Sequence, residues 1–262
     1  MKMPVLFVSH GAPTLPLEPG DTGAVWRMLG ERLPKSSAIL VISAHWESPV
    51  PTVSRAIRPE TIHDFSGFPA QLYQLQYPAP GAPDLAQAAA RALQRAGIPV
   101  QFDDTRGLDH GAWVPLSLMY PAADIPVTQL SLQPDKDAAW HIALGRALQP
   151  LREQGVLIMG SGSITHNLRA VFNHPSGAAV PEWVSEFCDW MAEKIKTGDL
   201  EALSAYRTLA PHAAQNHPAD EHLLPLFVAL GAADKITDAQ RLNNVMTYGM
   251  LAMDVWLFDA HL

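Results

Sequence analysis

The chain has 262 residues, of which 48% are hydrophobic and 17% charged, so it can form a large core, and intrinsic disorder is excluded. Lys+Arg of 18 and Asp+Glu of 26 give a net charge of −8, and no basic stripe is present, which argues against a nucleic-acid partner. No run approaches the ~18 consecutive apolar residues of a membrane span. A single cysteine, Cys188, and no cleavable apolar segment at the start predict a cytoplasmic protein. The sequence sets no oligomeric state.

Short apolar runs alternate with amphipathic stretches along the chain. Strands are predicted at 4–9, 38–43, 52–56, 100–102, 126–132, 156–160 and 250–258. Helices are predicted around 23–32, 84–96, 136–149, 181–196 and 220–230, with Asp84 capping the second and Gly198 closing the fourth. This alternation predicts an α/β fold with a mostly parallel central sheet covered by helices on both faces. No repeat or linker divides the chain, so we expect one domain over residues 1–262.

Histidines stand at the ends of three predicted strands. His10 follows strand 4–9, His45 follows strand 38–43, and strand 156–160 leads to His166. The carboxyl ends of strands in an open α/β sheet meet in the ligand crevice. One histidine at a strand end is more often a hydrogen-bonded structural residue. Because His10 and His45 are delivered to the same edge, however, they indicate a shared metal.

Two further histidines lie on connections. His110 stands between Asp109, which is placed to orient a ring, and Gly111, which allows a close backbone approach. His222 precedes an apolar helix and is the preferred third ligand. His110 and His166 remain open as ligands, acid/base groups or orienting residues. His217 is expected to brace the turn before His222, and surface or packing roles are expected for His63, His141, His174, His212 and His261.

The motifs around these histidines resemble those of one enzyme family. They are Ser9-His-Gly11, Ser43-Ala-His-Trp46, His63-Asp-Phe-Ser-Gly-Phe-Pro69, Leu108-Asp-His-Gly-Ala-Trp113, Gly160-Ser-Gly-Ser-Ile-Thr-His-Asn167 and His217-Pro-Ala-Asp-Glu-His222. In this order, from residue 9 to about residue 226, the set resembles the class III extradiol ring-cleavage dioxygenases, and in particular their 4,5-DOPA dioxygenase branch.

The resemblance implies a non-haem metal enzyme that inserts O₂ into a DOPA-like catechol and opens the ring to a muconic semialdehyde. It implies His10, His45 and His222 as metal ligands and His166 and His110 as catalytic residues. Fe(II) is then expected for activity. Three imidazoles suit Zn(II) equally well, and Glu221 is a neighbouring carboxylate that is able to replace a ligand. The resemblance further implies that Phe65, Phe68 and Tyr73 belong to the substrate loop.

Two other functions remain open from the residues. A zinc-dependent hydrolase would use His166 or Glu221 as the base that activates water. A non-catalytic relative would keep the fold and a metal or ligand pocket. No compact Lys/Arg cluster marks a site for a substrate carboxylate, although Arg106 or Arg169 is in reach.

Overall fold

The computed structural model describes residues 2–175 and 177–260, and its centre is an eight-stranded sheet in the order β4-β3-β5-β2-β6-β1-β10-β7. The four middle strands are parallel: β1 (Val5–Ser9), β2 (Ala38–Glu47), β5 (Val127–Leu132) and β6 (Val156–Gly162). The outer strands are β3 (Thr52–Ser54), β4 (Gln101–Asp103), β7 (Gln240–Asn243) and β10 (Val255–Phe258). Of these, β10 runs antiparallel to β1, and β3 antiparallel to β5. The predicted mostly parallel α/β sheet is therefore confirmed.

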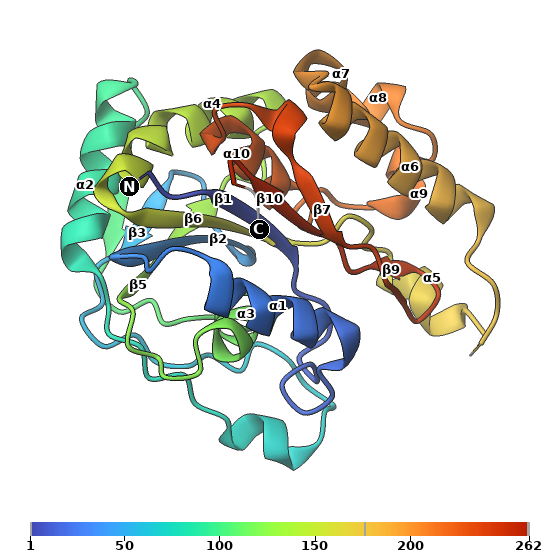
Figure 1. The fold of residues 1–262 in the computed structure, drawn as a ribbon, viewed down its shortest axis with the longest axis horizontal. Coiled ribbons are helices and arrows are strands. Elements are labelled where there is room, and N and C mark those ends of the chain that lie inside the picture. The colour runs from blue at the N-terminus through green and yellow to red at the C-terminus, as the bar shows by residue number, and fades with distance from the viewer. Residues whose placement is uncertain (1, 176, 261–262) are drawn as a thin grey trace.

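Helices cover both faces of this sheet (Figure 1). On one face lie α1 (Gly20–Arg32) and α3 (His110–Met119), whose Trp26 and Trp113 are fully buried in one core cluster. On the other lie α2 (Pro83–Arg95), α4 (Ala138–Leu148), α6 (Glu182–Thr197) and α10 (Leu224–Ala232). Strands buried on both faces read as continuous apolar runs, as in β1 and β6.

Shorter elements connect these layers. They are η1 (Ala70–Gln74), η2 (Gln149–Gln154), α5 (Leu168–Asn173), α7 (Leu200–Ser204), α8 (Tyr206–Leu209), α9 (Ala213–Asn216), η3 (Ile236–Asp238), β8 (Met246–Thr247) and β9 (Leu251–Ala252). Among the described residues, no helix has the length and apolar character needed to cross a membrane.

The C-terminal strand expected at 250–258 is divided. Its first part, β9, forms a small hairpin with β8, and its second part, β10, joins the main sheet. The break falls at Met253 and Asp254, where the buried Asp254 carboxylate accepts hydrogen bonds from Arg241 and Trp256. These donors compensate part of the cost of burying the carboxylate. The polar strand β7 lacked the apolar pattern that would have predicted it.

One expected helix cap is wrong. Asp84 does not cap α2; the capping position is Ala82, without a side-chain hydrogen bond, and Asp84 lies in the first turn. A carboxylate there still interacts favourably with the positive end of the helix. Gly198 ends α6 in the left-handed conformation, as predicted.

Candidate metal centre and active site

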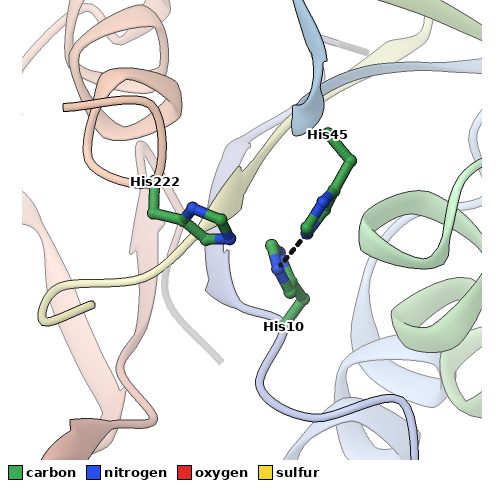
Figure 2. A group of neighbouring side chains, drawn as sticks. All are labelled: His10, His45 and His222. Atoms are coloured by element: carbon green, nitrogen blue, oxygen red, sulfur yellow. Dashed lines mark hydrogen bonds between the residues drawn. The ribbon is translucent and has the colours of Figure 1, made fainter. Parts of the chain in front are cut away.

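Three histidines from distant segments converge at the carboxyl edge of the sheet (Figure 2). His10 directly follows β1, His45 lies near the end of β2, and His222 lies in the turn before α10. One ring nitrogen from each lies within 4.8 Å of the others, and the Nε2 atoms of His10 and His45 are 3.0 Å apart. His10 and His222 are buried. The structure therefore brings together the three residues predicted as metal ligands.

The Nδ1 atom of each of these rings faces a partner outside the group of three histidines. Ser161 donates its hydroxyl hydrogen to the Gly111 carbonyl, so its Oγ accepts from His10 Nδ1 at 3.0 Å. His222 Nδ1 lies 2.9 Å from Glu221 Oε1, and His45 Nδ1 lies 3.4 Å from Asp64 Oδ2. The partners therefore assign the hydrogens to Nδ1. Unshared electron pairs of His10 and His45 then face each other, an arrangement that a cation between them stabilises.

A register break in β2 carries His45 into the site. The strand continues through Glu47, two residues past His45, and its pairing with β5 shifts between Ile42 and Glu47. His45 was predicted to follow the end of this strand, but it lies inside β2. Bulges of this kind re-aim side chains next to active sites.

Two glycines permit the close packing of this cluster. A Cβ on Gly111 would lie 2.3 Å from Ser43 Oγ and 3.2 Å from His45 Cδ2. A Cβ on Gly162 would lie 2.1 Å from the His222 carbonyl oxygen, which accepts a hydrogen bond from the Ser163 N–H. Gly111 therefore makes the close backbone approach that its sequence position predicted.

Asp109 does not orient a histidine ring, contrary to expectation. It caps α3 by accepting from the Ala112 N–H, and its carboxylate also accepts from Ser43, Gln129 and Arg106. A fully buried carboxylate needs this many donors. Arg106 in turn donates to the His45 carbonyl oxygen, so the network supports the backbone behind His45.

Two carboxylates connect the three converging histidines to two further histidines. Asp64 lies between His45 and His110, and Glu221 lies between His222 and His166. Asp64 Oδ1 lies 3.0 Å from His110 Nδ1, while its Oδ2 faces His45. Glu221 Oε1 lies 3.7 Å from His166 Nδ1, beside its hydrogen bond with His222. Asp64 belongs to the segment that resembles the substrate loop of the family, but no pattern in the sequence assigned it a contact with a histidine.

Burial keeps the rings of His10, His45, His166 and His222 uncharged. Burial and then the neighbouring imidazoles hold the pKa values of His10 and His222 well below their usual value. Burial lowers the pKa of His45 and that of His166 to about 4. Burial would raise the pKa of Asp64, but its hydrogen bonds with the side chain and backbone of His110, together with its attraction to His110 and His45, outweigh burial and bring it to about 2. Near neutral pH these four imidazoles are therefore neutral, the form that binds metals, and Asp64 is ionised.

A cavity of about 630 Å³ is lined in part by five histidines: His10, His45, His110, His166 and His222. Apolar side chains make up most of the remaining lining: Ala12, Pro13, Phe65, Phe68, Leu168, Val171, Phe172, Tyr248 and Leu251. This size and composition suit a small aromatic ligand. Glu221 lies behind the rings and is not part of the lining.

The other expected site residues divide into two groups. Phe65 and Phe68 line the cavity, whereas Tyr73 packs behind them, with its ring centroid 5.2 Å from that of Phe65. Neither Arg106 nor Arg169 is among the lining residues.

The remaining histidines stand apart from the cavity. His217 braces the turn through Ile164, with its Nε2 2.7 Å from the carbonyl oxygen. His63 packs against Phe65 and Trp113, His141 is buried, and His212 is exposed beside Glu186. His174 is half-buried, and His261 lies outside the described residues.

Comparison with known proteins places the chain in a family. Residues 5–255 match the family described as the catalytic LigB subunit of aromatic ring-opening dioxygenase. The chain belongs to this family of metal-dependent enzymes, and it is a non-haem extradiol dioxygenase. The match does not favour a zinc hydrolase or a non-catalytic binding protein.

Individual relatives agree with this assignment. A protein of Beta vulgaris named 4,5-DOPA dioxygenase extradiol is 44% identical over 254 residues, covering 93% of each chain. A protein of the same name from Escherichia coli K12 is 42% identical over 236 residues, covering 89% of this chain and 86% of that protein. The crystal structure of an uncharacterized Escherichia coli K12 protein matches with a TM-score of 0.83 at 34% identity, covering 98% of this chain and 100% of that chain.

Proposed function

We propose that this protein opens the ring of a catechol with O₂ at an Fe(II) ion held by His10, His45 and His222. The facing Nε2 atoms of His10 and His45, 3.0 Å apart with both Nδ1 atoms turned to other partners, carry the ligand assignment. The buried, neutral state of these rings supports it further, because metals bind the unprotonated imidazole. DOPA, for which the relatives are named, is the first catechol to assay.

The overall reaction needs no external reductant. One catechol and one O₂ combine, so that both oxygen atoms and every hydrogen of the substrate appear in the muconic semialdehyde. When bound, Fe(II) supplies the redox chemistry between the catechol and O₂, which Zn²⁺ is unable to supply because it has no redox change. Zn(II) would therefore occupy the same ligands and bind a catechol without turnover.

His166 is the proposed base. Burial lowers its pKa to about 4, so it is neutral near pH 7 and able to accept a proton from a catechol hydroxyl. Glu221, 3.7 Å from His166 Nδ1, would stabilise the ring once it is protonated. The stacking of His166 on His222 holds the base beside the three proposed ligands.

His110 is the proposed acid. Its Nδ1 is 3.0 Å from Asp64 Oδ1, which orients the ring and leaves Nε2 for the cavity. From this position Nε2 would take up a proton that a catechol hydroxyl releases and return it to the oxygen released as the ring opens, so that protons balance. Phe65 and Phe68 would pack against the aromatic ring of the substrate and exclude water from this end of the cavity.

Anaerobic reconstitution tests the proposal. The protein is loaded with Fe(II) or Zn(II) without air, its metal content is measured, and DOPA or another catechol is added with O₂. We expect O₂ uptake and a yellow ring-opened product from the iron form alone. Full iron occupancy with no O₂ uptake from any catechol in a panel would overturn the proposal. Turnover by the zinc form would overturn the assignment of Fe(II).

A further inference from the structure

Ser161 is a polar residue on a strand face that is otherwise apolar. Side chains two residues apart on a strand point to the same face of a sheet, so Leu157, Met159 and Ser161 of β6 share one face. Leu157 and Met159 belong to the core cluster that contains Trp113 of α3. Ser161 is fully buried beyond them. A buried hydroxyl costs free energy unless it is hydrogen-bonded, so the partners of Ser161 explain its place in this core.

The register of the sheet brings the His10 ring to this hydroxyl. Strands β1 and β6 pair in parallel, with Val8 opposite Ser161. His10 lies two residues after Val8, and its backbone N–H donates to the Gly162 carbonyl oxygen at 3.0 Å. In this position His10 Nδ1 lies 3.0 Å from Ser161 Oγ. The contact is therefore anchored on two central strands.

A proline leaves the Gly111 carbonyl available to the same hydroxyl. In an α-helix each carbonyl oxygen accepts a hydrogen bond from the N–H four residues later. Four residues after Gly111 stands Pro115, inside α3, which has no N–H, so the usual helical donor to this carbonyl is missing. Ser161 donates its single hydroxyl hydrogen to this oxygen. If that hydrogen pointed at His10 instead, the buried carbonyl would lose this donor, which is unfavourable.

The other two proposed ligands have partners of a different kind. Their Nδ1 atoms face the carboxylates of Asp64 and Glu221. An ionised carboxylate only accepts hydrogen bonds, so by itself it places the hydrogen of a facing ring on Nδ1. A hydroxyl both donates and accepts, and by itself it would allow either tautomer of His10. Donation to Gly111 removes this choice, because Ser161 then has only its acceptor function to offer the ring.

We propose that Ser161 is a positioning residue of the metal centre. Its hydroxyl, held by the Gly111 carbonyl, keeps the hydrogen of His10 on Nδ1 and so leaves Nε2 open to the ion. Pro115 keeps that carbonyl free of a helical donor. The proposal rests on the metal site of the proposed function, and it concerns a residue that is not among those lining the cavity.

Zinc affinity, measured by competition with a chelator, tests this role without turnover. Ser161→Ala should weaken zinc binding by about 10- to 100-fold, as the loss of a ligand's hydrogen-bond partner does. Ser131→Ala is the matched control, because it removes another fully buried strand hydroxyl, bonded to Ser48 on the neighbouring chain segment. It should keep wild-type zinc affinity, and urea unfolding compares the structural cost of the two variants. Wild-type zinc affinity in Ser161→Ala would overturn the proposal.

Nuclear magnetic resonance of zinc-loaded protein with ¹⁵N-labelled histidine observes the hydrogen bond itself. In wild type we expect His10 to bind zinc through Nε2 and to show an Nδ1–H that exchanges slowly with water. In Ser161→Ala that signal should move upfield and exchange faster, a change that loss of mere packing would not cause. Zinc binding through His10 Nδ1, or an unchanged signal in the variant, would overturn the proposal. The wild-type spectrum tests it even if Ser161→Ala fails to fold.

Pro115→Ala tests the part given to the proline. The variant restores an N–H four residues after Gly111, so the helix then competes with Ser161 for the carbonyl. A carbonyl oxygen has two lone pairs, so the competition is partial. We expect the His10 Nδ1–H signal to move in the same direction as in Ser161→Ala, with a smaller loss of zinc affinity. An unchanged signal would overturn the role of Pro115.

The zinc measurements separate this proposal from the proposed function. If wild type binds zinc and Ser161→Ala binds it equally well, the positioning role is overturned and catechol cleavage is left intact. If iron-loaded wild type takes up no O₂ with any catechol, the proposed function is overturned, while the zinc measurements still decide the role of Ser161.

Discussion

His166 stacks face to face on His222, with ring centroids 3.4 Å apart and planes inclined by 10°. His166 faces Glu221 and stands outside the group formed by His10, His45 and His222. The stacking thus separates a histidine suited to proton transfer from three histidines suited to hold the ion. Different consequences are expected when members of the two sets are removed.

Replacing a proposed ligand should empty the site. His10→Ala or His45→Ala should lose metal retention, whereas His166→Ala should keep the metal and reduce kcat by about 10²- to 10⁴-fold, since only a proton acceptor is lost. Elemental analysis after gel filtration and O₂ uptake measure the two effects. His212→Asn, which removes an exposed imidazole, is the control that should retain both. Loss of metal from His166→Ala would make His166 a fourth ligand.

Asp64→Asn should weaken both metal retention and turnover. Its carboxylate faces His45 with one oxygen and His110 with the other, and loss of such orienting carboxylates costs about 10- to 100-fold in affinity or activity. Metal titration and kcat/KM provide the readouts. Asp104→Asn, at the exposed ion pair with Arg55, is the matched control. Unchanged affinity and kcat/KM in Asp64→Asn would show that Asp64 only lines the cavity.

Gly111→Ala should displace His45. The added Cβ would meet Ser43 Oγ and His45 Cδ2, and relieving such overpacking costs roughly 1 to 3 kcal/mol in the free energy of unfolding. Urea unfolding and metal analysis test this. Gly97→Ala, with φ of +76° and nothing within 4 Å, should lose about 1 kcal/mol through backbone strain and retain its metal. Full metal retention by Gly111→Ala would contradict the expected displacement.

His141 should make the metal-free protein less stable in mild acid. Burial lowers its pKa to about 4, below the ~6.5 of an unfolded chain, so the unfolded state binds its proton first as the pH falls. The stability that the neutral His141 contributes to the folded state is fully present above pH ~6.5. It declines between pH ~6.5 and pH ~4 and is lost at lower pH. Between about pH 7 and about pH 5 we expect a loss of roughly 2 kcal/mol in the free energy of unfolding.

The measurement compares wild type with His141→Gln in the presence of a chelator. Urea unfolding at both pH values should show a smaller pH-dependent loss in the variant, whatever its absolute stability. Equal losses in the two proteins would mean that His141 titrates normally in the folded state.

Much of the site could be predicted because apolar strands determine where a histidine that follows them lies. His10 follows a strand buried on both faces, and Ser161 lies near the end of the neighbouring parallel strand β6, so their meeting at one edge follows from the parallel sheet. The length of β2 was less predictable, since polar residues follow Ser43 and the strand continues only through a register break against β5.

The parts that escaped prediction depend on contacts between distant segments. Asp64 meets His110 across 46 positions of the chain, and no local spacing signals that contact. Strand β7 is polar, and its pairing with β10 holds it in the sheet. Tyr73 shares an aromatic segment with Phe65, but only the folded loop reveals that its ring supports the cavity wall from behind.

The cavity wall formed by α5 and the β8–β9 hairpin and the histidine cluster belong to separate parts of the molecule. Helix α5 and the β8–β9 hairpin lie outside the eight-stranded sheet, whereas His10 and His45 are anchored on its central strands. Substitutions in α5 or in the hairpin are therefore expected to leave the pairing of the central strands unchanged. During evolution the range of aromatic substrates is able to change through substitutions in these two small peripheral segments. The residues proposed to act on O₂ then stay the same.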